Sequence, residues 1–170
     1  MTKLDTSGKQ VRIIFLGIGS NLGNKKNNIE KAKSHLIENN INLVSVSKYY
    51  NTPSWPNPKN PKFINIVVKA YCALEPELLL DLCKSIEKKL GRKKNPKNSP
   101  RECDIDIIDF DGKIKKNGLI LPHKMMHVRN FVLIPLFEIE KNWIHPIMKT
   151  NIKKLIFSLP NKDIRSIKQI

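Results

Sequence analysis

The first apolar stretch of the chain runs from residue 11 to residue 19, VRIIFLGIG, and is rich in β-branched and aliphatic side chains. A continuous run of this kind is typical of a buried strand. The spacing then changes to that of a helix, which Asn24 can cap and which we expect to end near Glu38. The apolar residues that recur at helical spacing in this part are Ile29, Ala32 and Leu36.

Two further strands are predicted between residues 41 and 74, with a proline-rich loop between them. Residues 41–50, INLVSVSKYY, alternate loosely between apolar and polar side chains, and residues 63–74, FINIVVKAYCAL, are strongly β-prone. Residues 52–61 contain four prolines in ten positions, so they cannot pair in the interior of a sheet. We therefore expect this segment to be an extended loop.

The clearest helix is predicted after Pro76, because proline is tolerated in the first turn of a helix. Gly91 can end this helix. The apolar residues of this segment follow the spacing i, i+3, i+4, i+7 and i+11. They are Leu79, Leu82, Cys83, Ile86 and Leu90.

Beyond this helix the elements become shorter. A basic, proline-containing loop at 92–102 leads into a strand at 104–110, DIDIIDF. We expect a short pair of strands near 113–121, and short helices near 131–138 and 151–159. The tail that follows is polar.

The main elements follow the order β-α-β-β-α-β, without an internal repeat or a low-complexity linker. This order favours an α+β fold of ferredoxin-like type, with helices packed on a mainly antiparallel sheet in three layers, α/β/α. At 170 residues the chain is long enough to bury one substantial core. We expect a single domain over residues 1–170, with residues 1–10 mobile.

The chain is strongly basic, with a net charge of +16. A clustered basic face would favour nucleic acid, but the lysines are spread along the whole chain, and only two Trp and three Tyr could stack on bases. No segment has the pattern of a membrane span or a cleavable leader, and three cysteines without CxxC spacing indicate reduced thiols. We expect a cytoplasmic monomer that binds neither nucleic acid nor membrane.

Acidic residues are concentrated in one place, since five of the fifteen fall within residues 102–111. Asp104 and Asp106 are two positions apart on a predicted strand, so they share a face at about 7 Å, while Ile105 and Ile107 enter the core. Two such carboxylates repel each other unless a cation lies between them. Oxygen ligands without Cys or His suit Mg²⁺, which also accepts waters and substrate phosphates. The alternative is an exposed acidic face with ordinary surface ion pairs.

Basic side chains stand on both sides of these carboxylates. Arg101 precedes them and is the best candidate for a bidentate phosphate clamp. His123 and Arg129 follow them, in LPHKMMHVRNF, and could donate to a phosphate. The glycines of GIGSNLGN resemble a phosphate loop only weakly, so we interpret Gly17 and Gly19 as a tight turn between strand and helix.

Taken in order, these stretches resemble the 6-hydroxymethyl-7,8-dihydropterin pyrophosphokinase family, whose pattern runs GSNL, VS..Y.T.P, F.N, E...GR, PR..D.D and PH..M..R.F. Any one of these motifs is weak. All of them in the right order and spacing, over roughly residues 11–140, leave little room for coincidence. In this chain the motifs begin at Gly19, Val46, Phe63, Glu87, Pro100 and Pro122.

The resemblance implies Mg-dependent transfer of pyrophosphate from ATP to 6-hydroxymethyl-7,8-dihydropterin, with release of AMP, in folate biosynthesis. It implies two Mg²⁺ ions on Asp104 and Asp106. These two residues, with Arg92 and Arg101, form the implied catalytic set. The residues that the resemblance assigns to ATP are Glu87, Arg92, Lys94, Arg101, Ile107, His123 and Arg129.

For the pterin, the resemblance assigns Asn65 to the polar edge of the ring, because an amide can both donate and accept hydrogen bonds. Phe63 and Phe131 would stack on the faces of the ring. The residues that would complete the pocket are Thr52, Pro53 and Trp55.

The chain departs from the family pattern mainly in its loops. Asn98 stands where a tryptophan is common, Lys84 stands where a glutamine is frequent, and the loop at 93–99 is a residue short. These departures affect the contacts of the adenine and the closing of the loop. Two alternatives remain open, a basic RNA-binding α+β domain and a family member that binds its ligands without catalysis.

Overall fold

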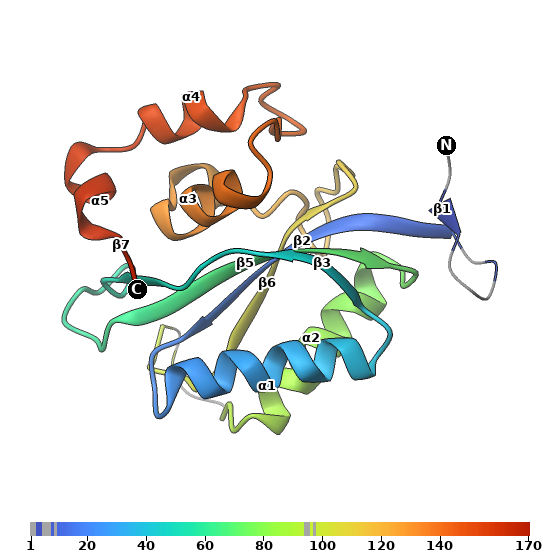
Figure 1. The fold of residues 1–170 in the computed structure, drawn as a ribbon, viewed down its shortest axis with the longest axis horizontal. Helices are drawn as coiled ribbons and strands as arrows, with labels where there is room; N and C mark the ends of the chain where they lie inside the picture. Colours follow the sequence, from blue (N-terminus) through green and yellow to red (C-terminus); the bar gives the residue numbers. More distant parts are fainter. Residues whose placement is uncertain (1–2, 5–7, 9, 94–95, 97) are drawn as a thin grey trace.

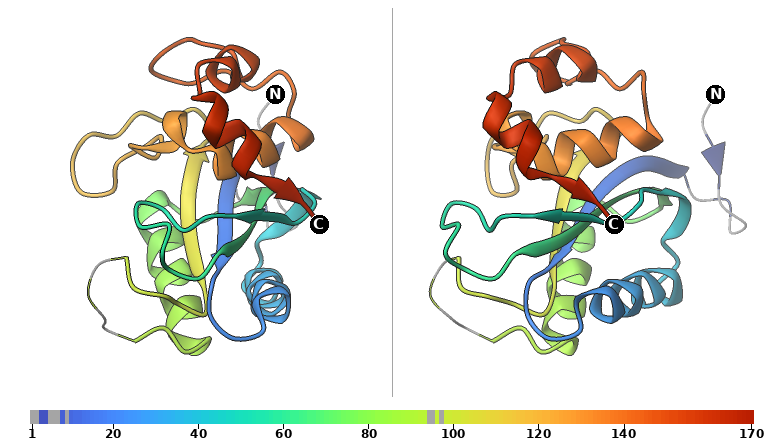
Figure 2. Two further views of the ribbon diagram at one scale, coloured as in Figure 1. Left: turned by 90° about the vertical axis from the view of Figure 1, so that its left-hand side faces the viewer. Right: turned by 60° about the vertical axis from the view of Figure 1, so that its left-hand side comes forward.

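The computed structural model describes residues 3–4, 8, 10–93, 96 and 98–170. The elements in chain order are β1 (Lys3–Leu4), β2 (Gln10–Ser20), α1 (Lys25–Glu38), β3 (Asn42–Val46), β4 (Tyr50–Thr52), β5 (Phe63–Cys72), α2 (Pro76–Lys89), β6 (Asp104–Phe110), the 3-10 helix η1 (Met126–Val128), α3 (Asn130–Ile139), α4 (Ile152–Phe157), α5 (Asn161–Ser166) and β7 (Lys168–Gln169). Helices α1 and α2 cover one face of the sheet, and α3 to α5 lie on the other (Figures 1 and 2). The predicted α+β fold, a sheet with helices packed on it, is confirmed. Most of the predicted mobile segment, residues 1–10, lies outside the described residues.

The strand β2 is the centre of the sheet, because it pairs with β5 on one side and with β6 on the other. β5 pairs in turn with β4 and β3, and β4 pairs on its outer side with β7. All of these pairings are antiparallel. The register places Gly19 between Asn65 of β5 and Asp104 of β6. The strand β2 therefore joins the residues expected to bind pterin to those expected to bind metal.

Two apolar cores stabilise the sheet, one on each face, and their burial contributes roughly 25 cal/mol per Å² of apolar surface. The core under α1 and α2 contains the apolar stripes predicted for both helices, together with alternate residues of β6. The core on the other side joins β2, β5 and β6 to α3 and α4. Its buried members include Phe15, Val67, Ile108, Leu133, Leu136, Trp143, Ile152 and Leu155.

The predicted signals at the helix ends are confirmed. Helix α1 begins after Asn24, whose side-chain oxygen accepts a hydrogen bond from the amide of Asn27 at 3.2 Å. Helix α2 has Pro76 in its first turn. Gly91 follows it with φ +105°, so the amides of Gly91 and Arg92 can bond carbonyls of the last turn at 3.1 and 3.0 Å. This turn directs Arg92 towards the sheet.

The single strand predicted at 41–50 ends early as β3 at Val46, and a second strand, β4, begins at Tyr50 and runs to Thr52. Ser47 interrupts the pairing, because its hydroxyl accepts the hydrogen bond of the Val67 amide at 2.9 Å in place of a strand carbonyl. The pair of strands predicted near 113–121 is reduced to one bridge between Lys115 and Leu121. The polar tail, which carries no periodic pattern, forms α5 and β7.

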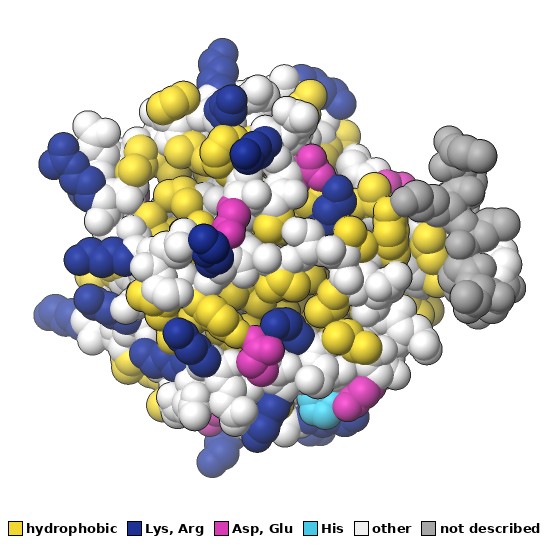
Figure 3. Space-filling view, in the orientation of Figure 1, with side chains coloured by type: hydrophobic (Ala, Val, Ile, Leu, Met, Phe, Trp, Pro, Cys, Tyr) yellow, Lys and Arg dark blue, Asp and Glu magenta, His cyan; other side chains and the backbone are white. Residues whose placement is uncertain are grey.

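On the face shown in Figure 3, Lys and Arg side chains are spread among apolar and uncharged atoms. The helices of the described part are all too short or too polar to cross a membrane. The three cysteines are buried and unbonded, as predicted for reduced thiols.

Candidate active site

Strand β6 presents two carboxylates on the face of the sheet that carries α3. Ile105 and Ile107 are 0% and 3% exposed and belong to the core under α1 and α2, so Asp104 and Asp106 project from the opposite face. The side chain of Asp104 is 18% exposed and that of Asp106 is 37% exposed. The two carboxylates therefore share a face, as their spacing predicts, and Asp106 is the more open of the two.

The next two acidic residues of the cluster, Asp109 and Asp111, lie at the end of β6 and in the turn that follows it. Asp109 is buried and accepts hydrogen bonds from Trp143 Nε1 at 2.8 Å and from the amide of Gly112 at 3.0 Å. Asp111 occupies the turn after β6 with φ +51° and is exposed. Asp109 and Asp111 thus hold the turn that follows β6 and lie away from the aspartate pair.

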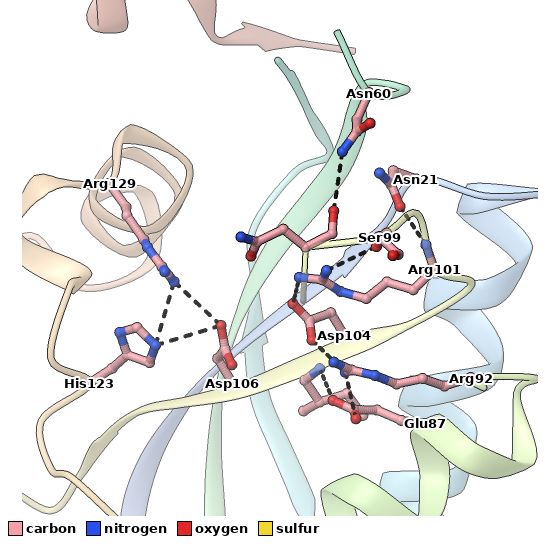
Figure 4. Close-up of polar contacts among 12 residues, drawn as sticks. Asn21, Asn60, Glu87, Arg92, Ser99, Arg101, Asp104, Asp106, His123 and Arg129 are labelled. Atoms are coloured by element: carbon pink, nitrogen blue, oxygen red, sulfur yellow. Dashed lines mark hydrogen bonds and ion pairs between the residues drawn. The ribbon is translucent and has the colours of Figure 1, made fainter. Parts of the chain in front are cut away.

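Asp104 is held between two arginines (Figure 4). Its Oδ1 lies 2.6 Å from Arg92 NH1, and its Oδ2 lies 2.5 Å from Arg101 NH2. Arg92 NH1 is also 2.7 Å from the carboxylate of Glu87, whose side chain is 1% exposed. The same carboxylate accepts a hydrogen bond from the amide of Ile105 at 2.8 Å. Glu87 thereby fixes both Arg92 and the start of β6.

Asp106 has more distant partners on the other side of the site. His123 Nε2 lies 3.8 Å and Arg129 NH1 lies 3.6 Å from Asp106 Oδ2, as Figure 4 shows. Arg129 NH1 and His123 Nε2 are 3.4 Å apart. Asp106 therefore makes no close ion pair among the described residues, and its oxygens are open to a ligand.

These surroundings separate the pKa values of the two carboxyl groups. Burial acts to raise the pKa of Asp104, but Arg101 and Arg92 outweigh it and hold the pKa below its ordinary value. Burial and then the charge of Asp104 raise the pKa of Asp106. Burial also lowers the pKa of His123, against the opposing effect of Asp106. The site thus contains one firmly ionised carboxylate beside one whose ionised form is disfavoured.

A smaller cavity opens beside the aspartates, and β2, the end of β4, β5 and the start of α3 form its walls. Asn65 is 8% exposed, and its Nδ2 donates to the hydroxyl of Thr52 at 2.8 Å. This bond fixes the direction of the Asn65 amide. The cavity brings together all six residues predicted for the pterin, Thr52, Pro53, Trp55, Phe63, Asn65 and Phe131.

The interpretation of Gly17 and Gly19 as a turn is wrong, since both lie inside β2 and pair with strands on both sides. Both glycines line the smaller cavity. A Cβ on Gly19 would lie 2.6 Å from Asn65 Oδ1 and 3.3 Å from Phe63. Glycine is therefore required at residue 19 because another strand's side chain approaches the backbone closely.

Aromatic rings and guanidinium groups alternate around this cavity. The guanidinium carbon of Arg129 lies 4.9 Å from the ring centre of Trp55 and 5.5 Å from that of Phe131. That of Arg101 lies 5.3 Å from the ring centre of Phe63. Such cation–π contacts hold the two arginines over the cavity. Trp55 itself is 47% exposed, so it forms the outer rim.

A larger, more polar cavity lies on the other side of the aspartates. Lys84, Arg92, Lys93 and His123 line it, together with residues of the 96–102 loop. Both cavities are lined by Asn98, Arg101, Asp104, Asp106 and Arg129. The two cavities therefore meet at the aspartate pair.

Among the described residues, two buried side-chain nitrogens lack a hydrogen-bond partner, and they are the Nε atoms of Arg101 and Arg129. Both arginines line both cavities. Buried donors without partners are rare in folded proteins. Their position at the junction fits a site that receives anionic oxygens.

Two of the residues predicted for ATP, Glu87 and Ile107, line neither cavity, and a third is not described. Glu87 is buried behind Arg92 and lines neither cavity, so it positions Arg92 instead of facing a ligand. The Ile107 side chain is in the core, which leaves only the backbone of this residue for ATP. Lys94 lies outside the described residues.

Asn21, to which the sequence pattern assigned no role, is 1% exposed and ties two loops together. Its Oδ1 accepts the amide of Arg101 at 2.8 Å, and its Nδ2 donates to the carbonyl of Pro61 at 3.1 Å. The GSNL motif was the signal for this role. Lys84 and Asn98, noted in the sequence only as departures, both line the larger cavity.

A sequence model of the family described as 7,8-dihydro-6-hydroxymethylpterin-pyrophosphokinase (HPPK) matches residues 15–141. The 2-amino-4-hydroxy-6-hydroxymethyldihydropteridine pyrophosphokinase of Aquifex aeolicus is 37% identical over 83% of this chain and 88% of its own length. The enzyme of the same name from Methylorubrum extorquens is 39% identical over 74% of this chain and 80% of its own length.

Longer proteins also contain a segment similar to this chain. The folic acid synthesis protein FOL1 of Dictyostelium discoideum is 37% identical over 88% of this chain. The matched segment makes up only 23% of that protein. The crystal structure of Plasmodium falciparum HPPK-DHPS with pteroate has a TM-score of 0.69 at 16% identity, and the match covers 86% of this chain and 42% of that one. At this identity the structure shows a shared fold. From the family match and the two bacterial relatives, the chain belongs to the 7,8-dihydro-6-hydroxymethylpterin-pyrophosphokinase family.

Proposed function

We propose that this chain transfers pyrophosphate from ATP to the hydroxymethyl group of 6-hydroxymethyl-7,8-dihydropterin and releases AMP, a step in folate biosynthesis. The observation that carries the proposal is the meeting of two unlike cavities at Asp104 and Asp106. Transfer between two substrates needs such a junction, because the reacting atoms must be held about 3–3.5 Å apart. The bacterial relatives are named as pyrophosphokinases of this kind.

The larger cavity suits the triphosphate of ATP. Its cations can neutralise phosphate charge, and in phosphoryl-type transfer positioning and charge neutralisation supply most of the rate. Arg92 and Arg101 are now paired with Asp104 and would exchange this carboxylate for phosphate oxygens. Arg129 offers a further buried Nε donor without a partner. The same exchange would free Asp104.

The aspartate pair suits two Mg²⁺ ions. Asp106 has no ion-pair partner closer than 3.6 Å among the described residues, and Asp104 becomes available once its arginines turn to phosphate. Mg²⁺ prefers carboxylate oxygens combined with substrate phosphates. When bound, the ions would neutralise the charge of the phosphates and of the two carboxylates together.

The smaller cavity suits the pterin ring. Phe63 and Phe131 line it and can cover the faces of the ring. Thr52 holds Nδ2 of Asn65, which leaves the Asn65 carbonyl and one amide hydrogen for the polar edge of the ring. The hydroxymethyl group would then point to the junction, where its oxygen attacks the β-phosphorus.

We extend the proposal to a single domain over residues 1–170, supported by the one sheet that both apolar cores share, and to a monomer as the working unit. The three buried, unbonded cysteines support a reducing compartment such as the cytoplasm. Lys94 belongs to this proposal through its place in the sequence alone, because it lies outside the described residues.

Product analysis tests the function directly. The protein is incubated with Mg-ATP and 6-hydroxymethyl-7,8-dihydropterin, and the nucleotide products are separated. We expect AMP and the pterin pyrophosphate in equal amounts, and none from the Asp106→Asn variant. Formation of ADP instead of AMP would contradict the proposal. Binding of both ligands without any product would identify the chain as the non-catalytic family member.

A further inference from the structure

The last ten residues form a strap, defined here as α5 with β7 (residues 161–170). The family model ends at residue 141, so the strap lies beyond it. Figures 1 and 2 show the strap, in red, running from the layer of α3 and α4 to the edge of the sheet. It contacts two elements that form walls of the smaller cavity.

The first contact is made with the start of α3. Asn130 Nδ2 donates to the carbonyl of Asp163 at 2.6 Å and to the hydroxyl of Ser166 at 3.1 Å. Its Oδ1 accepts the amide of Phe131 at 2.7 Å. Asn130 thus ties the strap to the position between Arg129 and Phe131, both of which line the smaller cavity. The family pattern R.F specifies no residue at this position.

The second contact is made with the edge of the sheet. β7 pairs with β4, with Gln169 opposite Tyr50 and Lys168 opposite Asn51, and the amide of Ile170 donates to the carbonyl of Tyr49 at 2.9 Å. β4 has only three residues and ends at Thr52, which orients Asn65. Without β7, β4 would be a short edge strand with one open side.

We propose that the strap is a positioning element for the second substrate, in which Asn130 and β7 hold Phe131 and Thr52 at a fixed separation across the smaller cavity. The inference rests on the proposed function, because it takes the pterin as the occupant of this cavity. No side chain of α5 is fully buried, and Ile164 packs only partly buried against the core under α3 and α4, so hydrogen bonds make a large share of the strap's attachment. Its loss should therefore loosen these walls more than the fold as a whole.

Three variants separate positioning from folding. Asn130→Asp keeps an oxygen for the Phe131 amide but removes both donors to the strap. Deletion of residues 167–170 removes β7 and leaves α5 in place. Lys162→Ala, at an exposed position of α5, is the matched control. The dissociation constants of 6-hydroxymethyl-7,8-dihydropterin and of a non-hydrolysable ATP analogue are measured separately by calorimetry.

The proposal makes a selective prediction, that Asn130→Asp and the deletion each weaken pterin binding about tenfold, which corresponds to the loss of one or two hydrogen bonds. Nucleotide binding should change less than about twofold, and the control should match the wild type. An equal loss for both ligands would show general loosening and overturn the proposal. Unchanged pterin binding in both variants would also overturn it.

Amide hydrogen exchange without any ligand separates this inference from the proposed function. In both variants exchange should become faster in β4 and in the first turn of α3, and should be unchanged in α1 and α2. Unchanged exchange at β4 and α3 would refute the strap even if the enzyme is active. If the wild type binds no pterin, the proposed function fails, and this measurement still decides whether the strap holds the two walls.

Discussion

Arg101 NH2 lies 2.5 Å from Asp104 Oδ2, so a cation suited to phosphate is paired with a carboxylate suited to a metal. Arg92 occupies the other oxygen of Asp104 at 2.6 Å, and the buried Glu87 holds Arg92. Arginines in the chain itself therefore reduce the repulsion expected between Asp104 and Asp106, but the charge of Asp104 still raises the pKa of Asp106 after the larger effect of burial. Binding of Mg-ATP has to exchange these ion pairs for contacts with the ligands.

This exchange predicts that the affinity of the protein for a divalent ion depends on the nucleotide. We expect Arg101→Met to bind Mn²⁺ alone more tightly than the wild type, by about tenfold, because a charged hydrogen bond no longer occupies Asp104. With a non-hydrolysable ATP analogue present the order should reverse, because the variant lacks a phosphate ligand. Electron paramagnetic resonance of free Mn²⁺ measures both affinities.

Arg165→Met is the control for removal of one positive charge, because Arg165 is an exposed residue of α5. It should leave both Mn²⁺ affinities unchanged. If Arg101→Met weakens Mn²⁺ binding with and without nucleotide, Arg101 does not compete with the metal for Asp104. That result would contradict the proposed exchange of ion pairs for ligand contacts, but it would not contradict binding of ATP at this site.

The two aspartates should have opposite effects on stability at neutral pH. Asp104→Asn leaves Arg101 without its close charged partner and Arg92 with Glu87 alone, so we expect the free energy of unfolding to fall by about 1–3 kcal/mol. Asp106→Asn removes a like charge that has no close ion pair, so stability should stay level or rise. Urea unfolding measures both. Equal losses in the two variants would show that Asp106 is also held by its neighbours.

The direction of each pKa shift gives the pH dependence of this comparison. The pKa of Asp106 is raised, so the cost of its ionised form builds up as the pH rises through that pKa. The gain in Asp106→Asn should therefore be full above the raised pKa and vanish in acid. The pKa of Asp104 is lowered, so its contribution is present above the unfolded pKa and is lost as the pH falls through the folded pKa. Unfolding across this acid range tests both signs.

Gly19 and Gly17 offer a matched pair of substitutions within β2. A Cβ at Gly19 would lie 2.6 Å from Asn65 Oδ1, which cannot move away without breaking the bond to Thr52. A Cβ at Gly17 would meet the Ile108 side chain, with Cδ1 at 3.3 Å and Cγ1 at 3.7 Å. We expect Gly19→Ala to cost about 1–3 kcal/mol of stability, as overpacking does, and to weaken pterin binding strongly. Gly17→Ala should lose less stability and less pterin affinity. Unfolding curves measure the stability and calorimetry measures the affinity, and equal losses in the two variants would contradict this prediction.

The order of the elements followed from the sequence because periodicity reports which side chains face a core. The apolar stripe of α2 and the alternation in β6 were both visible in that way. β7 was not visible in the sequence, because Lys168 and Gln169 become a strand only through pairing with β4. Gly19 was misinterpreted because a glycine near the end of a strand usually signals a turn, and the approach of Asn65 comes from a distant strand.

The site was predictable to the extent that its residues fall into motifs. The spacing of Asp104 and Asp106 placed both on one face, and the aromatic residues with Asn65 meet in one cavity. The partners of these residues were not predictable, because they depend on how separate segments meet. The buried Glu87 facing Arg92 is an example, since a charged residue on a helix is usually exposed.

The cysteine that precedes Asp104 provides a probe of local opening at the site. Burial raises the pKa of Cys103 and of Cys83 to about 12, and both are 0% exposed, so neither should react with a thiol reagent in the closed protein at neutral pH. Labelling of Cys103 then requires the start of β6 to open, whereas labelling of Cys72 requires opening at the far end of β5. An ATP analogue with Mg²⁺ should slow labelling of Cys103 more than that of Cys72, because ligand binding stabilises the closed state around Asp104. Mass spectrometry of the labelled peptides distinguishes the three thiols in one experiment, and equal slowing at all of them would show that the start of β6 opens only when the whole chain unfolds.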